Sequence, residues 1–495
     1  MKQLSSEYKS DIVQLWTFQE FNFVFCPEAF FSILRQEWTY PHGAAPNTWP
    51  FQVYYKMKSS EVMPMMLLQG EAWKTPRHTM QTHMFSPKAA DSYQPGINRV
   101  VEDASLYLKS KSLSSSSPKA MSGDSVNQFL MNVSFEMLAQ VLLDRRMGLV
   151  DIIVGDDGNA AAAAVDDEGR ANNKAETDLF VSSAVDAFHA LGYMLLKPPI
   201  IEDPRVLRTI FPVWREFEQS MEHVWDIGMR WLEQAEQDNS ETAFVTKLAT
   251  GQQGKMGRQE RLVNLITLLQ AGVDTTSNSL AWAVIELARR PEVQEKLRKE
   301  LNETIPEGEN YSRQQHKLPY LKAFMRELQR VSPAAGGNMR KLPFDVQAGD
   351  YVLKKNSMIM WNQSLYSNDP ELVGGDPSEF RPERWLAYDK ATADINAKDE
   401  LDPRKPIPVD NKEYGVDMAP APILSHPLMS TAFGVGPRMC VGARVANNEM
   451  YSFLSKIVRD FEISMDPPDQ EVGTAVKLLN VPDPFPSIRF DPIEK

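Results

Sequence analysis

Cysteine is scarce in this sequence, because only Cys26 and Cys440 occur among its 495 residues. Two cysteines exclude the disulfide framework of a small secreted protein and favour a reducing or organellar compartment. Long hydrophobic runs are also missing: the apolar stretch at residues 21–34 is interrupted by polar residues and a proline. A membrane-spanning helix needs ~20 apolar residues in succession, so none is expected.

Positive charge is outnumbered as well, with 53 Lys and Arg against 66 Asp and Glu and a net charge of -13. This balance argues against non-specific nucleic-acid binding. Residues 1–10 contain neither the apolar core of a signal peptide nor an arginine-rich presequence. The remaining composition, 42% hydrophobic and 24% charged, is that of a globular protein with enough apolar material for a large core.

Helical periodicity dominates the chain. Two short runs of β-branched and aromatic residues, 12–18 and 21–25, predict a β-hairpin, and Pro27 then opens a helix. Apolar residues at three- and four-residue spacing predict most of the rest to be helical. The predicted helices are residues 27–35, 89–110, 178–196, 212–237, 259–290, 291–302 and 441–461. Strands are expected at 351–353 and within 476–490, which gives a mainly α fold with a small β-sheet region.

Three segments predict loops or insertions because their composition cannot bury enough apolar surface to fold alone. They are the Ser-rich 111–122, the Ala- and Asp-rich 155–174 and the Pro- and Asp-rich 387–427. None is long enough for a separate domain, and no internal repeat is visible. We therefore expect a single domain over residues 1–495.

The segment 433–444, Phe-Gly-Val-Gly-Pro-Arg-Met-Cys-Val-Gly-Ala-Arg, combines a cysteine with flanking glycines before a predicted helix. A thiolate is favoured at the start of a helix by the helix dipole and by unpaired backbone N–H groups, as an axial metal ligand requires. The glycines let the backbone approach a flat ligand, and Arg438 suits an anionic group such as a haem propionate. For an isolated cysteine, the alternative is a buried structural thiol.

Five residues of this segment occur at fixed spacing: Phe433, Gly436, Arg438, Cys440 and Gly442. In this pattern the segment resembles the haem-binding loop of the cytochrome P-450 family, the haem-thiolate monooxygenases. The resemblance implies the cytochrome P-450 fold, with haem b between the helices predicted at about 259–290 and about 441–461. It also implies that the cysteine thiolate is the axial ligand of the haem iron.

A second motif, Ala-Gly-Val-Asp-Thr-Thr at residues 271–276, lies inside the long predicted helix. Gly272 and two consecutive threonines are poor helix formers, which predicts a local distortion; a helix with a tolerated glycine is the alternative. The motif resembles the distal helix of the family. That resemblance implies that Asp274 and Thr275 deliver protons for dioxygen activation.

Glu327 and Arg330 stand three residues apart, a spacing that usually gives a solvated surface pair. Downstream, however, residues 380–385 read Phe-Arg-Pro-Glu-Arg-Trp and resemble the Pro-Glu-Arg segment of the family. The resemblance implies that Glu327, Arg330 and Arg384 form a buried triad. Its role would be structural rather than catalytic.

Trp73 and Arg77 lie one helical turn apart, so that an indole N–H and a guanidinium can converge on one carboxylate. Pro76 between them is unusual within a helix. The pair resembles the Trp-x-x-x-Arg pattern with which the family contacts a haem propionate. Arg340 occupies a place where family members often supply another propionate-binding arginine.

Three basic residues resemble those of the mitochondrial branch, which takes electrons from a small acidic ferredoxin: Lys322, Arg326 and Arg444. A basic docking face makes sense on an acidic protein, whereas the alternative is a few solvated charges. Ala443 departs from the branch, in which a second basic residue is usual. The branch implies a mitochondrial location, peripheral on the inner membrane.

The resemblance extends over residues 12–490, and family members carry a targeting or anchoring segment and a first helix before the strand expected at Ile12. We therefore expect a truncated N-terminus; a short soluble form is the alternative. Family position makes residues 63–68, 333–338 and 476–479 candidate walls of a substrate pocket. The apolar tip between helices 178–196 and 212–237 is a candidate for peripheral membrane contact, with core packing as the alternative.

These patterns together predict an enzyme that inserts one atom of dioxygen into a lipophilic substrate, sterol-like or fatty-acid-like, with electrons from a ferredoxin-type partner. One alternative is a haem-thiolate peroxide isomerase or peroxygenase. Relatives of that kind usually lose the acid and the alcohol, and this chain keeps Asp274 and Thr275. Another alternative is a haem-binding protein without catalysis.

Overall fold

The computed structural model describes residues 12–16, 20–25, 27–36, 41–43, 48–58, 62–113, 120–150, 167–195, 202–250, 255–363, 367–368, 370–373, 376–397, 432–476 and 479–494. The chain divides into two compact units. The smaller unit comprises Met1–Ala45, Gln69–Lys74 and Leu318–Cys440, and the larger unit comprises Pro46–Leu68, Thr75–Lys317 and Val441–Lys495. A single domain over the whole chain stays a prediction.

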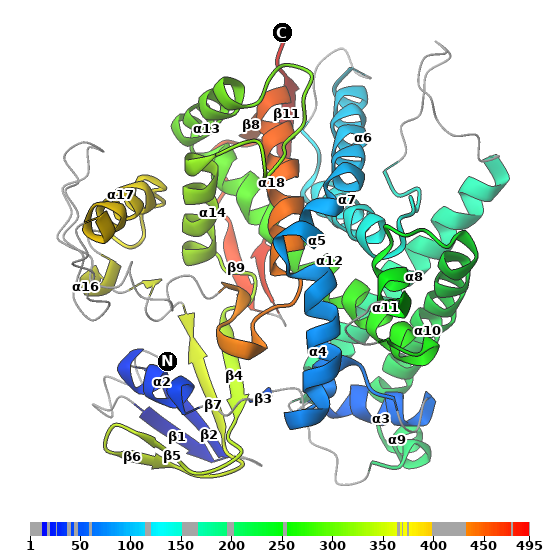
Figure 1. Ribbon diagram of the computed structural model, residues 1–495. Coiled ribbons are helices and arrows are strands. Elements are labelled where there is room, and N and C mark those ends of the chain that lie inside the picture. The colour runs from blue at the N-terminus through cyan, green and yellow to red at the C-terminus, as the bar shows by residue number, and fades with distance from the viewer. Residues whose placement is uncertain are drawn as a thin grey trace. The chain divides into compact units, whose positions relative to one another are not determined.

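A five-stranded sheet organises the smaller unit, in the order β1-β2-β7-β4-β3. The predicted hairpin is confirmed, because β1 (Ile12–Trp16) and β2 (Glu20–Val24) pair antiparallel. β2 runs parallel to β7 (Met358–Asn362), which pairs antiparallel with β4 (Gly337–Lys341) (Figure 1). β4 pairs on its other side with β3 (His42–Gly43), so hydrogen bonds on both sides fix its register.

The other elements of the smaller unit are α2 (Pro27–Arg35), the start of α4 (Gly70–Met84), α14 (Pro319–Val331), the hairpin of β5 (Val346–Ala348) and β6 (Tyr351–Leu353), α16 (Pro370–Val373), α17 (Glu383–Ala397) and the 3-10 turn η5 (Gly436–Arg438). An aromatic contact joins α2 to the sheet. The ring centroids of Phe30 and Trp361 lie 3.8 Å apart, and both side chains are fully buried. Trp385 of α17 joins the same core.

The larger unit is mainly helical. Its helices are α3 (Trp49–Lys58), η2 (Met65–Leu67), α5 (Pro87–Ser92), α6 (Gln94–Leu113), α7 (Gly123–Leu143), α8 (Asp167–Leu195), α9 (Pro204–Ile210), α10 (Pro212–Asp238), α11 (Phe244–Thr250), α12 (Arg258–Arg289), α13 (Pro291–Thr304) and α18 (Ala443–Asp460). Two antiparallel pairs complete it: β8 (Phe461–Met465) with β11 (Ile488–Pro492), and β9 (Gly473–Val476) with β10 (Asn480–Asp483).

The 32-residue helix α12 is the central element of this unit, since it contacts α7, α8, α10, α11, α13 and α18. Figure 1 shows α12 and α18 crossing near the middle of the helical layer. Proline opens several of these helices, for example at Pro212 and Pro291, because its fixed φ suits the first helical position. Among the helices of this unit, α7 and α10 are followed at their C-terminal ends by Asp144 and Asn239, which have a left-handed backbone conformation.

Two predicted loops are partly wrong. The segment 155–174 was expected to be irregular, but α8 begins at Asp167; residues 155–166 lie outside the described residues. The segment 387–427 was expected to be a loop, but α17 continues to Ala397, and residues 398–427 lie outside the described residues. Both segments contain alanine and charged residues of good helix propensity, which can continue a helix even where few apolar residues are present to be buried.

Smaller deviations affect helix ends. α6 continues to Leu113 into the Ser-rich segment 111–122, of which residues 114–119 lie outside the described residues. The helix predicted at 89–110 is two helices, with a break at Tyr93. Pro95 accounts for the new start, because it lacks a backbone N–H and suits the first turn of a helix rather than its interior.

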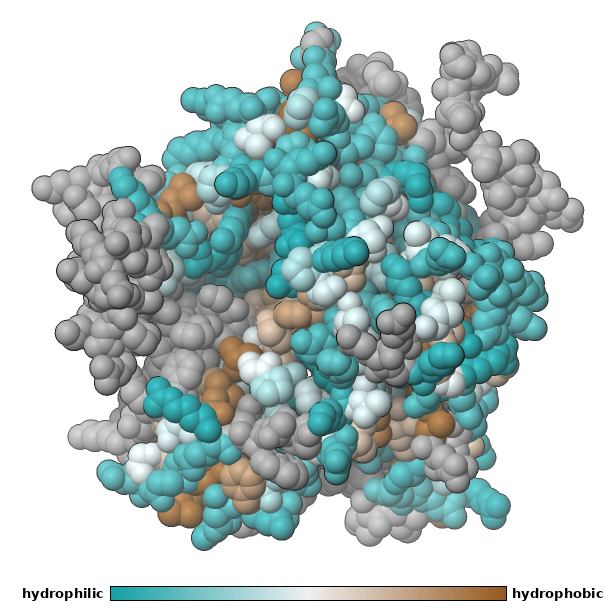
Figure 2. All heavy atoms as spheres, in the orientation of Figure 1, coloured by the Kyte–Doolittle hydropathy of each residue, from teal (hydrophilic) through white to brown (hydrophobic). Residues whose placement is uncertain are grey.

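The visible surface of the larger unit is mostly hydrophilic (Figure 2), as its charged composition leads one to expect. Large exposed apolar side chains do occur on α8 and α9: Tyr193 is 51% exposed and Ile210 is 54% exposed. Among the described residues, no helix combines the length and the apolar character that crossing a membrane requires.

Candidate active site

Cys440 ends a tight loop that begins at Phe433. The backbone N–H of Cys440 donates to the carbonyl oxygen of Phe433 at 2.7 Å, and η5 forms a single 3-10 turn between them. Gly434 and Gly436 have φ angles of 75° and 67°, a left-handed conformation that favours glycine. The Cys440 side chain is exposed. The loop therefore holds an accessible thiol at a fixed backbone position.

The guanidinium of Arg438 is fixed from three directions within the smaller unit. Its Nε donates to the carbonyl oxygen of Pro41 at 2.8 Å, and its Nη2 donates to Oε1 of Gln69 at 3.2 Å. The guanidinium also lies 4.2 Å from the ring centroid of Trp73. Gln69 Oε1 accepts a further bond from the backbone N–H of Gly43 at 2.9 Å. A cation held this way is preorganised for an anionic partner.

Arg340 lies on β4 and is only 6% exposed. Its Nη2 donates to the carbonyl oxygen of Val435 in the cysteine loop at 2.8 Å, and its guanidinium lies 5.5 Å from the ring centroid of Trp361. Gly43 pairs with Arg340 across the β3–β4 ladder, and a Cβ at Gly43 would lie 3.5 Å from Nη1 of Arg438. Gly43 is therefore a neighbour of both arginines: its backbone pairs with Arg340, and its Cα side faces the guanidinium of Arg438.

Electrostatics mark the same corner as positive. Burial, together with the positive charges of Arg438 and Lys341, holds the pKa of His42 below its usual value. His42 is therefore neutral at neutral pH and contributes no charge of its own. The corner is suited to one or two carboxylates.

Trp73 and Arg77 both belong to α4, and Pro76 lies inside this helix without ending it. Trp73 is part of the smaller unit, whereas Arg77 is part of the larger one, where its Nε donates to Oε1 of Gln81 at 3.3 Å. Both side chains are largely buried, at 5% and 6% exposure. The structure brings Trp73 together with Arg438, a contact that the sequence did not predict.

The motif at 271–276 lies in an unbroken α-helix, so the predicted distortion of α12 is wrong. Gly272 has a packing role instead, because a Cβ there would lie 2.6 Å from Cδ2 of Leu138 on α7. The Thr275 hydroxyl donates to the carbonyl oxygen of Ala271 at 3.0 Å, which satisfies it within the helix. Asn278 Nδ2 donates to the carbonyl oxygen of Asp274 at 2.8 Å.

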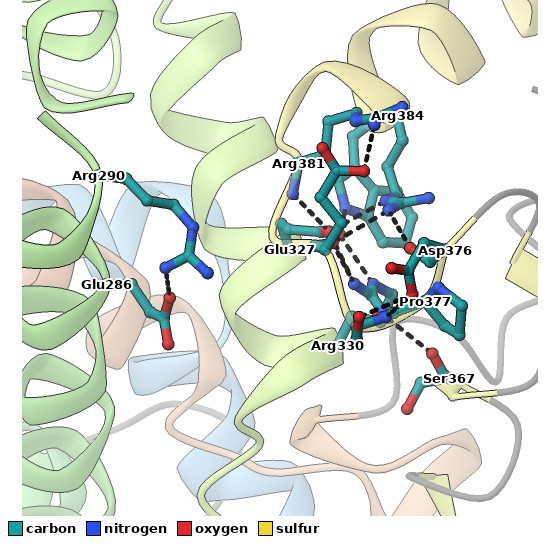
Figure 3. A network of polar contacts seen from close by, with 12 residues as sticks. Glu286, Arg290, Glu327, Arg330, Ser367, Asp376, Pro377, Arg381 and Arg384 are labelled. Atoms are coloured by element: carbon teal, nitrogen blue, oxygen red, sulfur yellow. Dashed lines mark hydrogen bonds and ion pairs between the residues drawn. The ribbon is translucent and has the colours of Figure 1, made fainter. Parts of the chain in front are cut away.

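Glu327, Arg330 and Arg384 form one buried network in the smaller unit (Figure 3). Arg330 binds the Glu327 carboxylate with two bonds of 2.8 and 2.9 Å, and Nε of Arg384 donates to it at 3.0 Å. Trp385 Nε1 and the backbone N–H of Arg381 add bonds of 2.8 and 2.9 Å. Burial alone would raise the pKa of Glu327, but the bonds and charges of the two arginines hold it below its usual value.

A cysteine loop, two fixed arginines and an indole next to them are a donor set that fits haem. The exposed thiol can ligate iron, and Arg438 and Arg340 can neutralise the two propionates. The sequence model of the family described as Cytochrome P450 matches residues 1–486 of this chain. The chain belongs to the cytochrome P450 family.

Relatives of this cytochrome P450 include three mitochondrial enzymes. The chain is 26% identical over 484 residues to the human (Homo sapiens) protein "25-hydroxyvitamin D-1 alpha hydroxylase, mitochondrial", covering 94% of this chain and 82% of the relative. It is 24% identical over 472 residues to "Sterol 26-hydroxylase, mitochondrial" of Rattus norvegicus, with 92% and 77% covered. It is 25% identical over 468 residues to "Cholesterol side-chain cleavage enzyme, mitochondrial" of Capra hircus, with 93% and 77% covered.

Family membership makes the protein a P450 monooxygenase of mainly α-helical P450 fold, and the family uses a haem-thiolate cofactor, a substrate and dioxygen. In this P450 Gly442 precedes α18 with a φ of -85°, so its backbone conformation does not by itself require glycine. Phe433 contributes to the cysteine loop through its backbone carbonyl oxygen, which accepts the hydrogen bond from the Cys440 N–H.

The three basic residues predicted to dock a partner differ in their surroundings. Lys322 on α14 is exposed. Arg326 is half-buried, with its guanidinium 4.2 Å from the ring centroid of Trp385 and a bond of 2.7 Å to Asp389. Arg444 belongs to the larger unit, where it lies 5.1 Å from the ring centroid of Phe85.

The candidate pocket walls fall in different units, so the structure does not test them as one cavity. Residues 63–68 contain η2, whose Met65 N–H donates to Oδ1 of Asn264 on α12 at 2.8 Å. Residues 333–338 belong to the smaller unit. Of residues 476–479, Val476 is 79% exposed, and residues 477–478 lie outside the described residues.

One functional candidate was missed entirely: Glu449 of α18 is 2% exposed, and Oε1 of its carboxyl has no hydrogen-bond partner among the described residues. Burial raises the pKa of Glu449 to about 8, and the nearby Thr276 hydroxyl offsets only part of this rise. A single glutamate within a helical pattern gives no signal of this kind. Gln69 and the Pro41 carbonyl were missed for the same reason, since neither belongs to a motif.

Proposed function

We propose that this cytochrome P450 inserts one atom of dioxygen into a lipophilic, sterol-like or fatty-acid-like substrate, with haem b held by the Cys440 thiolate. The observation that carries the proposal is the closed loop that joins an accessible Cys440 to a fixed Arg438. Bound haem would supply the activation of dioxygen, and thiolate ligation favours O–O cleavage. The overall reaction takes substrate, dioxygen, two electrons and two protons to hydroxylated product and water.

The residues of the smaller unit have distinct tasks in this proposal. Cys440 binds the iron, and its loop keeps the sulfur in place through the bond from its own N–H to Phe433. Arg438 and Arg340 would neutralise the propionates, and the ring of Trp73 lies next to the guanidinium of Arg438 and helps to orient it. Arg77 of the larger unit is proposed as a further propionate contact.

Proton handling falls to Asp274 and Thr275 on α12. A threonine hydroxyl both donates and accepts, so it can take a proton from one side while giving one on the other. The Thr275 hydroxyl donates its one proton to the carbonyl oxygen of Ala271 at 3.0 Å, so its lone pairs are available to accept a proton, and this bond has to open before the hydroxyl donates elsewhere. An acid one residue before it is suited to replace the proton that it gives.

Electrons are proposed to come from an acidic ferredoxin-type protein that docks on Lys322, Arg326 and Arg444. Exposed Lys322 suits a rim contact that steers the partner, whereas Arg326 is oriented by Trp385 and Asp389. The mitochondrial names of the relatives support this donor class.

A charge reversal tests the docking face. Lys322→Glu should raise the KM for reduced ferredoxin about fivefold, or ~1 kcal/mol, with kcat at saturating ferredoxin unchanged. Lys354→Glu is the matched control, because Lys354 is an exposed lysine of the same unit that pairs with Asp345. Equal KM values for the two variants and the wild type would remove Lys322 from the proposed interface.

We place the protein in the mitochondrion, peripheral on the inner membrane, as a further part of the proposal. Its support is the mitochondrial location that the relatives' names give and the exposed apolar side chains of α8 and α9, including Tyr193 and Ile210. Such side chains can enter the interfacial layer of a bilayer and admit a lipophilic substrate.

The direct test of function supplies purified holoprotein with NADPH, ferredoxin reductase and ferredoxin, and offers a panel of sterols, secosteroids and fatty acids under isotopically labelled dioxygen. We expect a product that carries one labelled oxygen atom and depends on ferredoxin. Product formed only with added peroxide, and unlabelled by dioxygen, would contradict the monooxygenase assignment and favour a peroxygenase or an isomerase.

A further inference from the structure

A pair of hydroxyl groups joins α3 to α12 in the larger unit. Oη of Tyr55 lies 3.2 Å from Oγ1 of Thr267. The Thr267 hydroxyl donates its one proton to the carbonyl oxygen of Val263 at 2.7 Å, so Tyr55 is the donor between the two hydroxyls. Burial raises the pKa of Tyr55, which keeps this donor protonated. Both protons of the pair are therefore used in bonds to protein acceptors.

The two oxygen atoms of this pair can act toward a ligand only as hydrogen-bond acceptors. A hydroxyl oxygen has two lone pairs. Within the described part of the chain, Thr267 Oγ1 accepts the bond from Tyr55, and no further donor is directed at either oxygen. A ligand can therefore bind here through its own O–H or N–H group. A carbonyl or ether oxygen would meet another acceptor and gain no hydrogen bond.

The position of the pair is fixed by the packing around it. Tyr55 is 1% exposed, and its ring centroid lies 6.3 Å from that of Trp225 on α10. A second bond anchors the segment after α3 to the same part of α12, because the backbone N–H of Met65 donates to Oδ1 of Asn264 at 2.8 Å. Asn264 stands only three residues before Thr267. The acceptor is thus preorganised, which lowers the cost of ordering it when a ligand binds.

Thr267 belongs to a partly open strip along α12. Residues 267, 271 and 275 recur every four residues, and Leu268 lies beside them on the same face of the helix. Ala271 is exposed, and Thr267, Leu268 and Thr275 are half-buried, whereas most other residues in the middle of α12 are buried. A ligand that approaches the Thr275 hydroxyl along α12 therefore also meets Thr267.

The chemistry of the strip changes along its length. Thr267 offers an acceptor, Leu268 and Ala271 are apolar, and Thr275 is one of the two residues to which proton handling is assigned above. At a rise of ~1.5 Å per residue, the step from Thr267 to Thr275 is about 12 Å along the helix axis. A ligand that matches the strip has a hydrogen-bond donor at one end, an apolar body, and the carbon to be oxidised at the other end.

We propose that the substrate is a lipophilic alcohol whose hydroxyl donates a hydrogen bond to Thr267 Oγ1, about 12 Å from the carbon that is oxidised. The proposal rests on the proposed monooxygenase function, whose substrate class it specifies. Thr267 contacts the substrate, whereas Tyr55 acts through Thr267 and is a positioning residue. The pair accepts but does not donate, so an alcohol is preferred to the ketone, the ether or the hydrocarbon of the same shape.

Equilibrium binding to the resting holoprotein, measured by dialysis, tests the proposal without turnover. The ligands are two matched sets: androstanol, androstanone and androstane, which differ only at the A ring, and dodecanol, dodecyl methyl ether and dodecane. In at least one set, we expect the alcohol to bind at least about tenfold more tightly than the other two members. Equal affinities within both sets, or no binding by either alcohol, would overturn the proposal.

Variants of the pair show whether the preference for an alcohol arises at Thr267. Thr267→Val should remove the preference and leave hydrocarbon binding unchanged, whereas Thr267→Ser keeps the hydroxyl and should keep the preference. Tyr55→Phe should reduce it, because Thr267 loses the donor that orients its lone pairs. Thr250→Val is the matched control on α11, since the Thr250 hydroxyl also donates to the carbonyl oxygen four residues before it.

The decisive quantity is the ratio of the alcohol affinity to the hydrocarbon affinity. A merely structural hydroxyl pair would weaken the binding of all ligands alike in Thr267→Val and leave the ratio unchanged, and this result would overturn the proposal. The ratio is measured whether or not any product forms. Failure of the proposed monooxygenase function is therefore distinguishable from failure of the assigned substrate class.

The position of oxidation provides a second test in the reconstituted system. The alcohol that binds should be oxidised within a narrow range of carbons about 12 Å from its hydroxyl. Thr267→Val should spread oxidation over more positions, because the substrate is no longer held at that end, and Thr250→Val should not. An unchanged distribution of products in Thr267→Val would contradict the contact between Thr267 and the substrate hydroxyl.

Discussion

Arg438 shows how much of a cofactor site depends on single side chains. Its guanidinium is bound by the carbonyl oxygen of Pro41 and by Gln69, and it lies over Trp73. These partners hold the guanidinium in one orientation next to the cysteine loop. An oriented guanidinium forms strong charge-assisted hydrogen bonds with an anionic group, and this is the argument for a propionate at this place.

Replacing Arg438 by glutamine should weaken haem retention. A charge-assisted hydrogen bond contributes ~1.5–3 kcal/mol, so Arg438→Gln should speed the loss of haem to an acceptor protein by about ten- to hundredfold. Lys354→Gln, in an exposed pair of the same unit, should change the rate little. Haem transfer monitored by absorbance checks both, and wild-type retention in Arg438→Gln would contradict a propionate contact.

The lowered pKa of Asp460 predicts how the stability of the fold changes in acid. Burial alone would raise its pKa, but the Ser105 hydroxyl and the charges of Lys456 and Lys109 outweigh burial and lower the pKa to about 2. A lowered carboxyl pKa stabilises the fold above the unfolded pKa, and this stabilisation is lost as pH falls from about 4 to 2.

Asp460→Asn should therefore destabilise the holoprotein at pH 7 on the order of 2 kcal/mol, and the gap should narrow below pH 4. Urea unfolding at pH 7 and pH 3 measures both values. A gap that widens in acid would show that the pKa of Asp460 is not lowered.

At the scale of elements, two glycines of the larger unit should respond in opposite directions to the same substitution. A Cβ at Gly123, in the first turn of α7, would lie 2.1 Å from the carbonyl oxygen of Phe485. Gly192, inside α8, has no such neighbour within 4 Å. Gly123→Ala should cost ~1–3 kcal/mol, whereas Gly192→Ala should stabilise by ~0.5–1 kcal/mol. Thermal unfolding measures both; a shift of the same sign in the two variants would contradict the packing at Gly123.

The Glu327 network ties α14 to the segment before α17, and its loss should affect the whole smaller unit. Glu327→Ala leaves Arg330 and Arg384 buried without their carboxylate, which should cost ~3–5 kcal/mol and lower haem content and soluble yield together. Glu303→Ala removes one partner of an exposed ion pair on α13 and should cost less than ~1 kcal/mol. Normal yield and haem content in Glu327→Ala would contradict a structural role.

Sequence patterns predicted elements well where spacing and local chemistry agree. The hairpin of β1 and β2 and the helices α10, α12 and α13 lie within a few residues of their predicted bounds. The start of α8 and the part of α17 after Leu386 were missed because low hydrophobicity was taken as evidence against helix, although alanine and several charged residues in both have good helix propensity. Tertiary partners were harder still, since a carbonyl oxygen such as that of Pro41 has no signature in a sequence.

At the scale of the molecule, the motifs of the site are local in sequence, but the surroundings that tune them are not. The pattern of residues 433–442 predicts the cysteine loop. Glu449 and Thr276, by contrast, lie far apart in the chain and come close only because α18 packs on α12. Trp385 could be predicted in part. It follows Arg384 directly in the sequence, and a buried indole N–H usually has an acceptor, which here is the Glu327 carboxylate. Long-range packing therefore decides what single-sequence patterns leave open.

The central claim is that Cys440 binds haem iron as a thiolate, and the carbon monoxide difference spectrum of the ferrous protein tests it most directly. We predict the Soret band of a thiolate-ligated haem in the wild type and in Cys26→Ser, the sequence's other cysteine, and its loss in folded, haem-containing Cys440→Ser. Survival of the thiolate-type band in Cys440→Ser, or its absence from haem-loaded wild type, would contradict the account.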